Sequence, residues 1–363
     1  MDFAITEEQR ILQDGVALAL EALSPLDRVR HAAERNEPLA RDVWQGLVAL
    51  GVPAMLIPEA HGGLGLKMLD AALVAEMLGR YVAPVPYVAS CVMAPLALRS
   101  AGSSAQQAAW LPRMANGEII TGVAIAEAAA GARDGAGVTA TNGRLTGIAL
   151  FVMDGVDAGL FIVADRAGAL HLVDPYARGV QLIPLTTVDV TRPVCELRFE
   201  SVRAEPLGGD ASVATMQRMR DAGRVMLAAD TLGAGWRMIE MATAYAKQRK
   251  QFGRAIGSFQ AVKHMCAEMA AELEPGRALM WYAAHAQDHL PEEASLMAAH
   301  AKAYLTEVGR FVARTAVEVH GGIGITDLLG LHYWFKRIGV NRQLLGGPER
   351  LREEAARLQG LAA

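Results

Sequence analysis

The sequence predicts a mainly α-helical protein with a central β domain: helices, then a small sheet, then a helical bundle. Ala-rich stretches with few prolines favour helix over most of the chain. Between about 119 and 205 the pattern changes to short apolar runs bounded by glycine and aspartate, which is typical of strands. The 363 residues are too many for one ordinary core, so we expect two or three domains or layers.

Residues 1–118 are predicted to form the N-terminal helical domain. The stretch Ser104–Glu118, SAQQAAWLPRMANGE, opens with a serine suited to capping a helix, continues with helix formers and ends at Asn116-Gly117. A glycine-rich connection, IPEAHGGLGL, occupies Ile57–Leu66.

Residues 119–210 are predicted to form the middle β domain. LTGIALFVM and AGLFIVAD are short apolar runs, and CELRFES alternates, with Leu197 and Phe199 as its apolar members. The sequence TNGRL indicates a hairpin that turns through Asn142-Gly143.

Residues 211–363 are predicted to form the C-terminal helical bundle. A long helix should reach Arg249 with one apolar stripe, on which Met226 and Trp236 are expected to be buried. A second helix follows Ser258. A third spans about 293–319 and stops at HGGIG, where glycine can adopt a left-handed conformation.

Composition and charge narrow the class of protein. A net charge of −4 argues against a dedicated nucleic-acid binder. No uncharged apolar run is long enough to span a bilayer, and the start MDFAITEEQR does not resemble a signal peptide. Cys91, Cys195 and Cys266 are far apart and lack any CxxC spacing, so we expect no metal site, no disulfide framework and a cytoplasmic location.

The stretch RKQFGRAIG, which begins at Arg249, is a candidate phosphate site. Lys247, Arg249, Lys250 and Arg254 bring four cations next to Phe252 and two glycines. Arginine can donate two parallel, charge-assisted hydrogen bonds to a phosphate. The alternative is a solvated helix end whose cations are favoured by the helix dipole.

Several motifs occur in a specific order along the chain: IPEAHGGLGL, AEMLGR (Ala75–Arg80), YAKQRKQFGRAIGSFQAVKH (Tyr245–His264) and VHGGIGIT (Val319–Thr326). Together they resemble the acyl-CoA dehydrogenase family, flavoenzymes that desaturate acyl-CoA thioesters, and the resemblance covers nearly the whole chain. It implies a β-barrel-like middle domain, a C-terminal four-helix bundle and the cofactor FAD.

The resemblance implies that cofactor-binding residues reach across a subunit interface, in a dimer or tetramer of family-related subunits. Arg249, Gln251, Phe252 and Gln260 would contact FAD held mainly by a neighbouring subunit. Arg249 would bind its phosphates, and Phe252 would offer an apolar surface to a ring.

The glycine-rich motif would serve the same neighbouring flavin. Gly321 and Gly322 allow backbone N–H groups to approach a phosphate closely. Glu318 stands where relatives carry glutamine, and a carboxylate near a diphosphate is unfavourable unless it is neutralised or turned away. Asp221 and Arg224 lie where relatives contact the acyl-CoA substrate; the alternative is a surface salt bridge between residues three apart.

The chain departs from the family at the catalytic base. Removal of an α-proton from a thioester requires a positioned base, and relatives place a glutamate at one of two positions. Here these positions hold Gly223 and Gly346. The Thr-Glu-Pro segment beside the flavin ring keeps only Glu127, between Ala126 and Ala128. The aromatic-aliphatic-hydroxyl triplet is FVM at 151–153, without a hydroxyl.

These departures leave three interpretations open. In one, another carboxylate is the base, and Asp230 is the best candidate because it lies seven residues beyond Gly223 on the same helix face. In the second, which we favour slightly, the chain is the supporting subunit of a heteromeric pair and completes a catalytic partner. The third is a non-catalytic binding or scaffold protein that keeps the fold and holds no flavin. The sequence does not indicate the acyl group.

Overall fold

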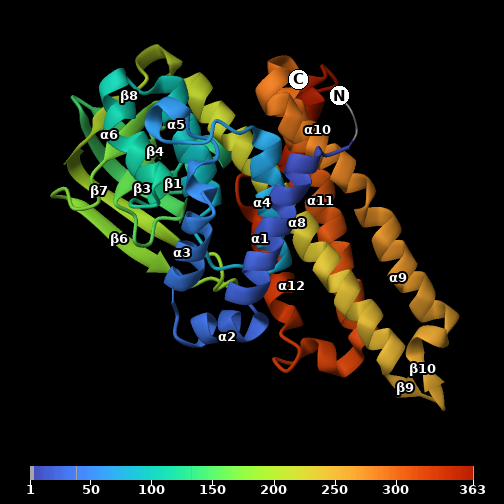
Figure 1. The fold of residues 1–363 in the computed structure, drawn as a ribbon. Helices are drawn as coiled ribbons and strands as arrows, with labels where there is room; N and C mark the ends of the chain where they lie inside the picture. The colour runs from blue at the N-terminus through green and yellow to red at the C-terminus, as the bar shows by residue number, and fades with distance from the viewer. Residues whose placement is uncertain (1–3, 38, 132, 363) are drawn as a thin grey trace.

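The computed structural model describes residues 4–37, 39–131 and 133–362. The sheet lies at one side of the molecule and the long C-terminal helices at the other, with N-terminal helices such as α1 and α4 between them (Figure 1). This arrangement confirms the predicted fold class.

The N-terminal helices pack onto the long helix α8 mainly through α4, α5 and η3, and α1 packs in turn on α4. They are α1 (Glu7–Leu23), α2 (Leu26–Glu34), α3 (Arg41–Ala49), α4 (Met68–Arg80), α5 (Ala94–Ala101) and α6 (Ser104–Ala115), with short η1 (Val52–Ala54), η2 (Glu59–His61) and the π-helix η3 (Val88–Met93) between them. Helix α6 starts one residue earlier than predicted, because its cap is Ser103, whose side chain accepts from the Gln106 N–H.

The middle of the chain forms a mixed sheet. Within the described residues the strands β1, β3 to β8 follow the order β6-β7-β3-β1-β4-β5-β8, and β2 pairs with β3. Only β1 and β4 pair in parallel among these strand pairs. Their bounds are β1 (Thr121–Ala124), β2 (Gly137–Thr141), β3 (Arg144–Met153), β4 (Leu160–Ala164), β5 (Leu170–Val173), β6 (Val180–Leu185), β7 (Val194–Arg203) and β8 (Glu205–Leu207), with α7 (Ala126–Ala130) after β1. The hairpin between β2 and β3 turns through Asn142-Gly143, as predicted, with φ of 50° and 71°.

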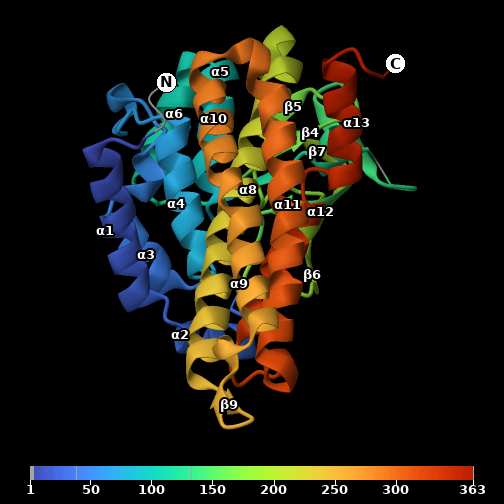
Figure 2. The same cartoon turned by 90° about the vertical axis from the view of Figure 1, so that its right-hand side faces the viewer.

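The C-terminal segment forms the bundle (Figure 2). Its elements are η4 (Gly209–Ala211), α8 (Ser212–Gln248), the hairpin strands β9 (Lys250–Gln251) and β10 (Arg254–Ala255), η5 (Ile256–Ser258), α9 (Gln260–Leu273), α10 (Pro275–His289), α11 (Pro291–His320), η6 (Gly321–Ile325), α12 (Leu331–Gln343) and α13 (Pro348–Leu358). Helices α8 to α11 are the four long helices of the predicted bundle. Helix α10 was not predicted as a separate element; it begins at Pro275, directly after α9.

Helix α8 is more deeply buried than one apolar stripe requires. Between Asp221 and Gly235 every residue is buried, because α4, α11 and α12 surround this part of the helix. Glycines permit the closest approach: a Cβ on Gly79 of α4 would lie 1.9 Å from the Asp230 carbonyl oxygen, and one on Gly233 would lie 1.8 Å from that of Glu76. The core of the protein is therefore centred on α8.

The prediction that Trp236 is buried was wrong, because its side chain is only partly buried. Met226 is fully buried, but Trp236 is only half-buried and its indole Nε1 has no hydrogen-bond partner. The Arg277 guanidinium of α10 lies 5.9 Å from the centre of its ring. The tryptophan therefore sits at the rim of the bundle. No helix in the described part of the chain is long and apolar enough to cross a membrane.

Candidate functional site

A groove at the end of the bundle brings together most of the predicted cofactor-binding residues. It has a volume of about 480 Å³ and lies where α8 ends, β9 begins and α11 passes into η6. Its walls are formed by Tyr245, Arg249, Gln251, Ile256, Glu318, Val319, His320, Gly321, Gly322 and Ile323. Two stretches seventy residues apart, both singled out from the sequence, therefore share one site.

Arg249 supplies the positive charge of this groove. It is the C-terminal cap residue of α8, its side chain is exposed, and its carbonyl accepts from the Ile256 N–H at 2.8 Å, which closes the base of the hairpin. In the portion of the chain that the structure covers, Arg249 forms no ion pair. The backbone of Arg249 is thus fixed at the mouth of the groove, and its guanidinium remains available to an anion.

Phe252 and Gln260 lie beside the groove and do not line it. Phe252 and Gly253 form the two-residue turn of the β9–β10 hairpin, with φ of 51° and 75°. The Phe252 side chain is 91% exposed at the tip of the hairpin, which projects beyond the end of the bundle (Figure 1). Such an exposed aromatic ring suits contact with another molecule, not with the groove of its own chain.

Gly321 and Gly322 leave the floor of the groove open. Gly321 has φ 64° and ψ −147°, a conformation essentially restricted to glycine, and a Cβ on either residue would meet nothing within 4 Å. Glu318 is exposed in the same groove. A diphosphate would fit Arg249 and the open glycine backbone, and Glu318 is the one feature here that opposes it.

Sequence reasoning missed the two ring-bearing residues of the groove, Tyr245 and His320, as well as its aliphatic lining. Their rings lie 4.7 Å apart, and His320 Nδ1 donates to the Ala316 carbonyl at 2.7 Å. Burial lowers the pKa of His320, which favours the neutral ring. The available signal was position: Tyr245 precedes Arg249 by one helical turn, and His320 directly precedes Gly321.

A second groove, of about 630 Å³, lies between the sheet and the end of α12. It is mainly apolar and is lined by residues of α7, β3, the β6–β7 connection, α12 and the 344–347 turn, including Glu127, Arg133, Phe151, Leu345, Gly346 and Arg350. Glu127 accepts from the Leu150 N–H at 2.6 Å, and burial raises its pKa. Of the triplet at 151–153, only Phe151 lines this groove; Val152 and Met153 are buried in the cores.

The two glycines at the predicted base positions are close neighbours. A Cβ on Gly223 of α8 would lie 2.6 Å from Leu345 Cδ1, and one on Gly346 would lie 3.5 Å from Arg224 Nη2. Residues more than 120 positions apart in sequence thus converge on one point, and this point carries no carboxylate from either position.

Asp221 and Arg224 are engaged in contacts within the chain. Arg224 is fully buried and makes a two-pronged ion pair with Glu354 of α13, with both N–O distances at 2.9 Å. Asp221 accepts from Arg224 Nη1 at 3.3 Å, from Arg220 Nε at 3.1 Å and from Ser295 Oγ at 2.5 Å. The predicted salt bridge between residues three apart exists, but it is buried and not at the surface.

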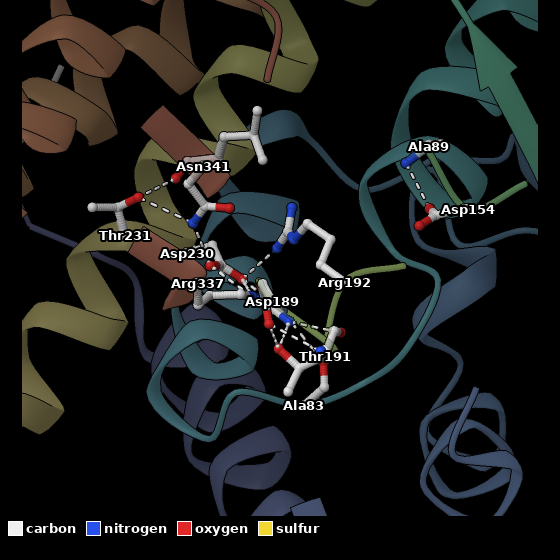
Figure 3. Close-up of polar contacts among 11 residues, drawn as sticks. Ala83, Ala89, Asp154, Asp189, Thr191, Arg192, Asp230, Thr231, Arg337 and Asn341 are labelled. Carbon is white, nitrogen blue, oxygen red and sulfur yellow. Dashed lines mark hydrogen bonds and ion pairs between the residues drawn. The ribbon is translucent and has the colours of Figure 1, made fainter. Parts of the chain in front are cut away.

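Asp230 belongs to a buried ion cluster, not to either groove (Figure 3). Its carboxylate accepts from Arg192 at 2.8 Å, from Arg337 at 3.0 Å and from Asn341 at 2.6 Å. Burial alone would raise its pKa, but the charges of Arg337 and Arg192 outweigh burial and lower the pKa. A carboxylate held in this way is a poor proton acceptor, so the structure does not support Asp230 as the catalytic base.

A buried lysine holds the 344–347 turn in place through hydrogen bonds. Lys302 of α11 is fully buried, and its Nζ donates to the carbonyls of Gly346 at 2.6 Å and Arg342 at 3.3 Å. Burial, together with the charges of Arg224 and Arg342, lowers its pKa well below the usual value. No group of histidine, cysteine and carboxylate side chains suited to a metal ion occurs among the described residues.

Comparison with known proteins agrees with this fold. Residues 6–118 match the acyl-CoA dehydrogenase N-terminal domain, and residues 213–359 match the acyl-CoA dehydrogenase C-terminal domain. The chain is 31% identical to acyl-CoA dehydrogenase IpdE2 of Mycolicibacterium smegmatis, over 98% of this chain and 99% of the relative.

Two solved structures are also similar over nearly their full lengths. One is the ChsE4-ChsE5 complex of Mycobacterium tuberculosis, with 28% identity, a TM-score of 0.88 and complete coverage of both chains. The other is a variant of the Tcur3481-Tcur3483 steroid ACAD, with 29% identity, a TM-score of 0.86 and 98% coverage of each chain.

The fold and the matched domains define a flavoenzyme-type architecture of helices, sheet and four-helix bundle. The chain belongs to the acyl-CoA dehydrogenase family, whose general activity is oxidoreduction of acyl-CoA thioesters. The resemblance inferred from the motifs is thereby confirmed.

Proposed function

We propose that the chain is the base-lacking subunit of a heteromeric, FAD-dependent acyl-CoA dehydrogenase, with domains at 1–118, 119–210 and 211–363. One observation carries the proposal. The groove that would reach a partner's cofactor is assembled, with Arg249, Gln251 and the open glycines in its walls, whereas neither of the two usual base positions, Gly223 and Gly346, supplies a carboxylate.

The chain's own residues would act by binding and orientation. Arg249 would hold the diphosphate of FAD through charge-assisted hydrogen bonds, and Gly321 and Gly322 would let backbone N–H groups approach it. Phe252 and Gln260, outside the groove, would contact the partner's side of the cofactor. When bound, FAD supplies the acceptor for the hydride that leaves the β-carbon. The partner would supply the carboxylate that removes the α-proton.

Two solved relatives support a heteromeric assembly. Both are described as pairs of proteins, ChsE4-ChsE5 and Tcur3481-Tcur3483. The second is described as a steroid ACAD, which makes a bulky, ring-containing acyl-CoA a reasonable substrate for a pair that includes this chain. We further propose a cytoplasmic role in bacterial acyl-CoA catabolism of the β-oxidation type.

The proposal is tested by expressing the chain alone and together with a family member that carries the catalytic glutamate. The chain alone should bleach no bound flavin when given an acyl-CoA, and the co-purified pair should retain FAD and bleach it. Rapid bleaching by the chain alone would overturn the proposal, because it would require a base within this chain.

A second candidate function is a binding or scaffold protein of this fold that holds no flavin. Glu318 in the cofactor groove favours it, as do the alanines at 126 and 128 and the missing hydroxyl at 153. The colour of the purified pair distinguishes the two functions, because bound flavin is yellow. A pair that remains colourless in the presence of added FAD supports the scaffold, and a yellow pair excludes it.

A further inference from the structure

The guanidinium of Arg224 is satisfied entirely from inside the chain. Its Nε donates to the Leu345 carbonyl at 3.0 Å, and Nη1 and Nη2 donate to the two oxygens of Glu354, both at 2.9 Å. The side chain is completely buried. A planar cation with both prongs on one carboxylate has the geometry with which arginine binds an anionic ligand.

Side chains of the chain itself also fill the space next to Arg224. The Leu345 side chain occupies the volume in front of Gly223, within 2.6 Å of where a Cβ would lie, and Met93 Sδ is 2.9 Å from that position. Leu345 has φ 57°, a left-handed conformation that is costly for a residue with a side chain. Lys302 holds the turn through the Gly346 carbonyl, so the conformation is imposed by surrounding contacts.

The turn separates Arg224 from the neighbouring groove. Leu345, Gly346 and Gly347 form the wall of the 630 Å³ groove, and neither Arg224 nor Gly223 is part of its lining. Helix α13, which carries Glu354, is seated by Leu351 and Ala355 in a small apolar cluster with α11. The cation therefore lies behind a wall that the chain itself provides.

We propose that Glu354 is an internal ligand that, with Leu345, keeps the acyl-CoA position of this subunit closed. The inference rests on the proposed function and on the expectation, from the family resemblance, that Arg224 is the cation of that position. It adds that the subunit is inactive toward acyl-CoA for two separate reasons: it lacks the base, and its own side chains occupy the binding position. Restoring a glutamate alone therefore leaves the position closed.

The test compares butyryl-CoA binding by full-length variants, using calorimetric titration and thermal melting. Glu354→Gln removes the charge that holds this side chain on Arg224, so an anionic ligand can displace it. Glu353→Gln is the matched control, because Glu353 is its exposed neighbour and pairs with Arg357 on the outside of the same helix. Glu354→Gln should melt at a lower temperature than the wild type and should bind butyryl-CoA at least about tenfold more tightly. Butyryl-CoA should raise its melting temperature, with no such shift in the wild type or in Glu353→Gln.

Leu345→Gly provides an independent arm if Glu354→Gln does not fold. Glycine suits the left-handed φ and removes the side chain that fills the space before Gly223. This variant should also gain butyryl-CoA binding. The proposal is overturned if the wild type binds butyryl-CoA as tightly as the variants, or if the folded variants gain no binding.

Flavin retention separates this inference from the proposed function. Co-purified with a catalytic family member, the wild-type chain should retain FAD whatever its own affinity for butyryl-CoA. A pair without FAD would remove the proposed function. Unchanged butyryl-CoA affinity in folded Glu354→Gln and Leu345→Gly, with FAD retained by the pair, would remove only the internal-ligand proposal.

Discussion

At the residue scale, Arg249 tests the cofactor groove. Arg249→Ala should weaken FAD retention in the assembled pair, because it removes a hydrogen bond to a charged group worth about 1.5–3 kcal/mol, or about 10- to 150-fold in affinity. Lys247→Ala is the control, since Lys247 is exposed on the same helix end but outside the groove. FAD absorbance after gel filtration measures the effect. Equal occupancy in both variants would show that Arg249 does not bind the cofactor.

Glu318 should oppose the cofactor that Arg249 attracts. Two unit charges 4 Å apart in water repel by about 1 kcal/mol, which corresponds to about fivefold in affinity. Glu318→Gln should therefore tighten FAD binding by about this factor at low salt, and the difference should shrink as salt screens it. Fluorescence titration of the pair with FAD at two salt concentrations measures both. Weaker binding by Glu318→Gln would mean that the carboxylate accepts hydrogen bonds from the cofactor.

At the scale of elements, the glycines between α4 and α8 set how closely these helices pack. Gly79→Ala should destabilise the protein by at least about 1–3 kcal/mol, because its Cβ would lie 1.9 Å from the Asp230 carbonyl, and this cost exceeds the gain in helix propensity. Gly15→Ala in α1 is the matched control. Its Cβ would meet nothing within 4 Å, so this change should stabilise by about 0.4–1 kcal/mol. Urea unfolding measures both, and equal stability would show that the helices can separate without cost.

Individual helices and turns also show how much of the fold the sequence could predict. Local signals predicted elements well: Asn142-Gly143 forms the hairpin turn, and the end of α11 falls where the glycines allow it. The sequence could not predict which distant residues would pack against a given side chain. Trp236, for example, has as a neighbour the guanidinium of Arg277, which lies forty-one residues away on a helix that was itself missed.

The candidate site also has a part that the sequence could predict and a part that it could not. Motif resemblance named five residues that the fold brings into one groove. It placed Arg224 at the substrate, but the partner of Arg224 is Glu354, 130 residues further along, and no pattern in the sequence connects them. Pairings across such separations are set by how α8 and α13 pack, which periodicity does not encode.

At the scale of the whole molecule, the Asp230 cluster joins the three segments of the chain (Figure 3). Asp230 lies on α8, and Arg192 comes from the connection before β7. Arg337 of α12 also donates to the Ala83 carbonyl at 3.3 Å, beyond the end of α4. The cluster therefore ties the N-terminal helices and the sheet to the bundle, a structural role that accounts for Asp230 without any catalytic function.

Asp230→Asn should thus destabilise the whole fold by about 3–5 kcal/mol, because it removes the charge of the carboxylate that both buried arginines, Arg192 and Arg337, contact. Asp14→Asn on the exposed side of α1 is the control and should change stability by less than about 0.5 kcal/mol. Since the pKa of Asp230 is lower in the folded state than in the unfolded chain, its contribution is fully present above about pH 4. That contribution is lost as the pH falls through the folded-state pKa.

Chemical unfolding between pH 7 and pH 3 tests this linkage. The stability difference between the wild type and Asp230→Asn should be constant near neutral pH and should narrow in acid, as protonation removes the same charge that the substitution removes. The pair formed with a catalytic family member should keep its flavin bleaching by acyl-CoA when Asp230→Asn is folded. If the wild-type chain alone bleached flavin and an equally stable Asp230→Asn did not, the conclusion would be reversed and Asp230 would return to the role of base.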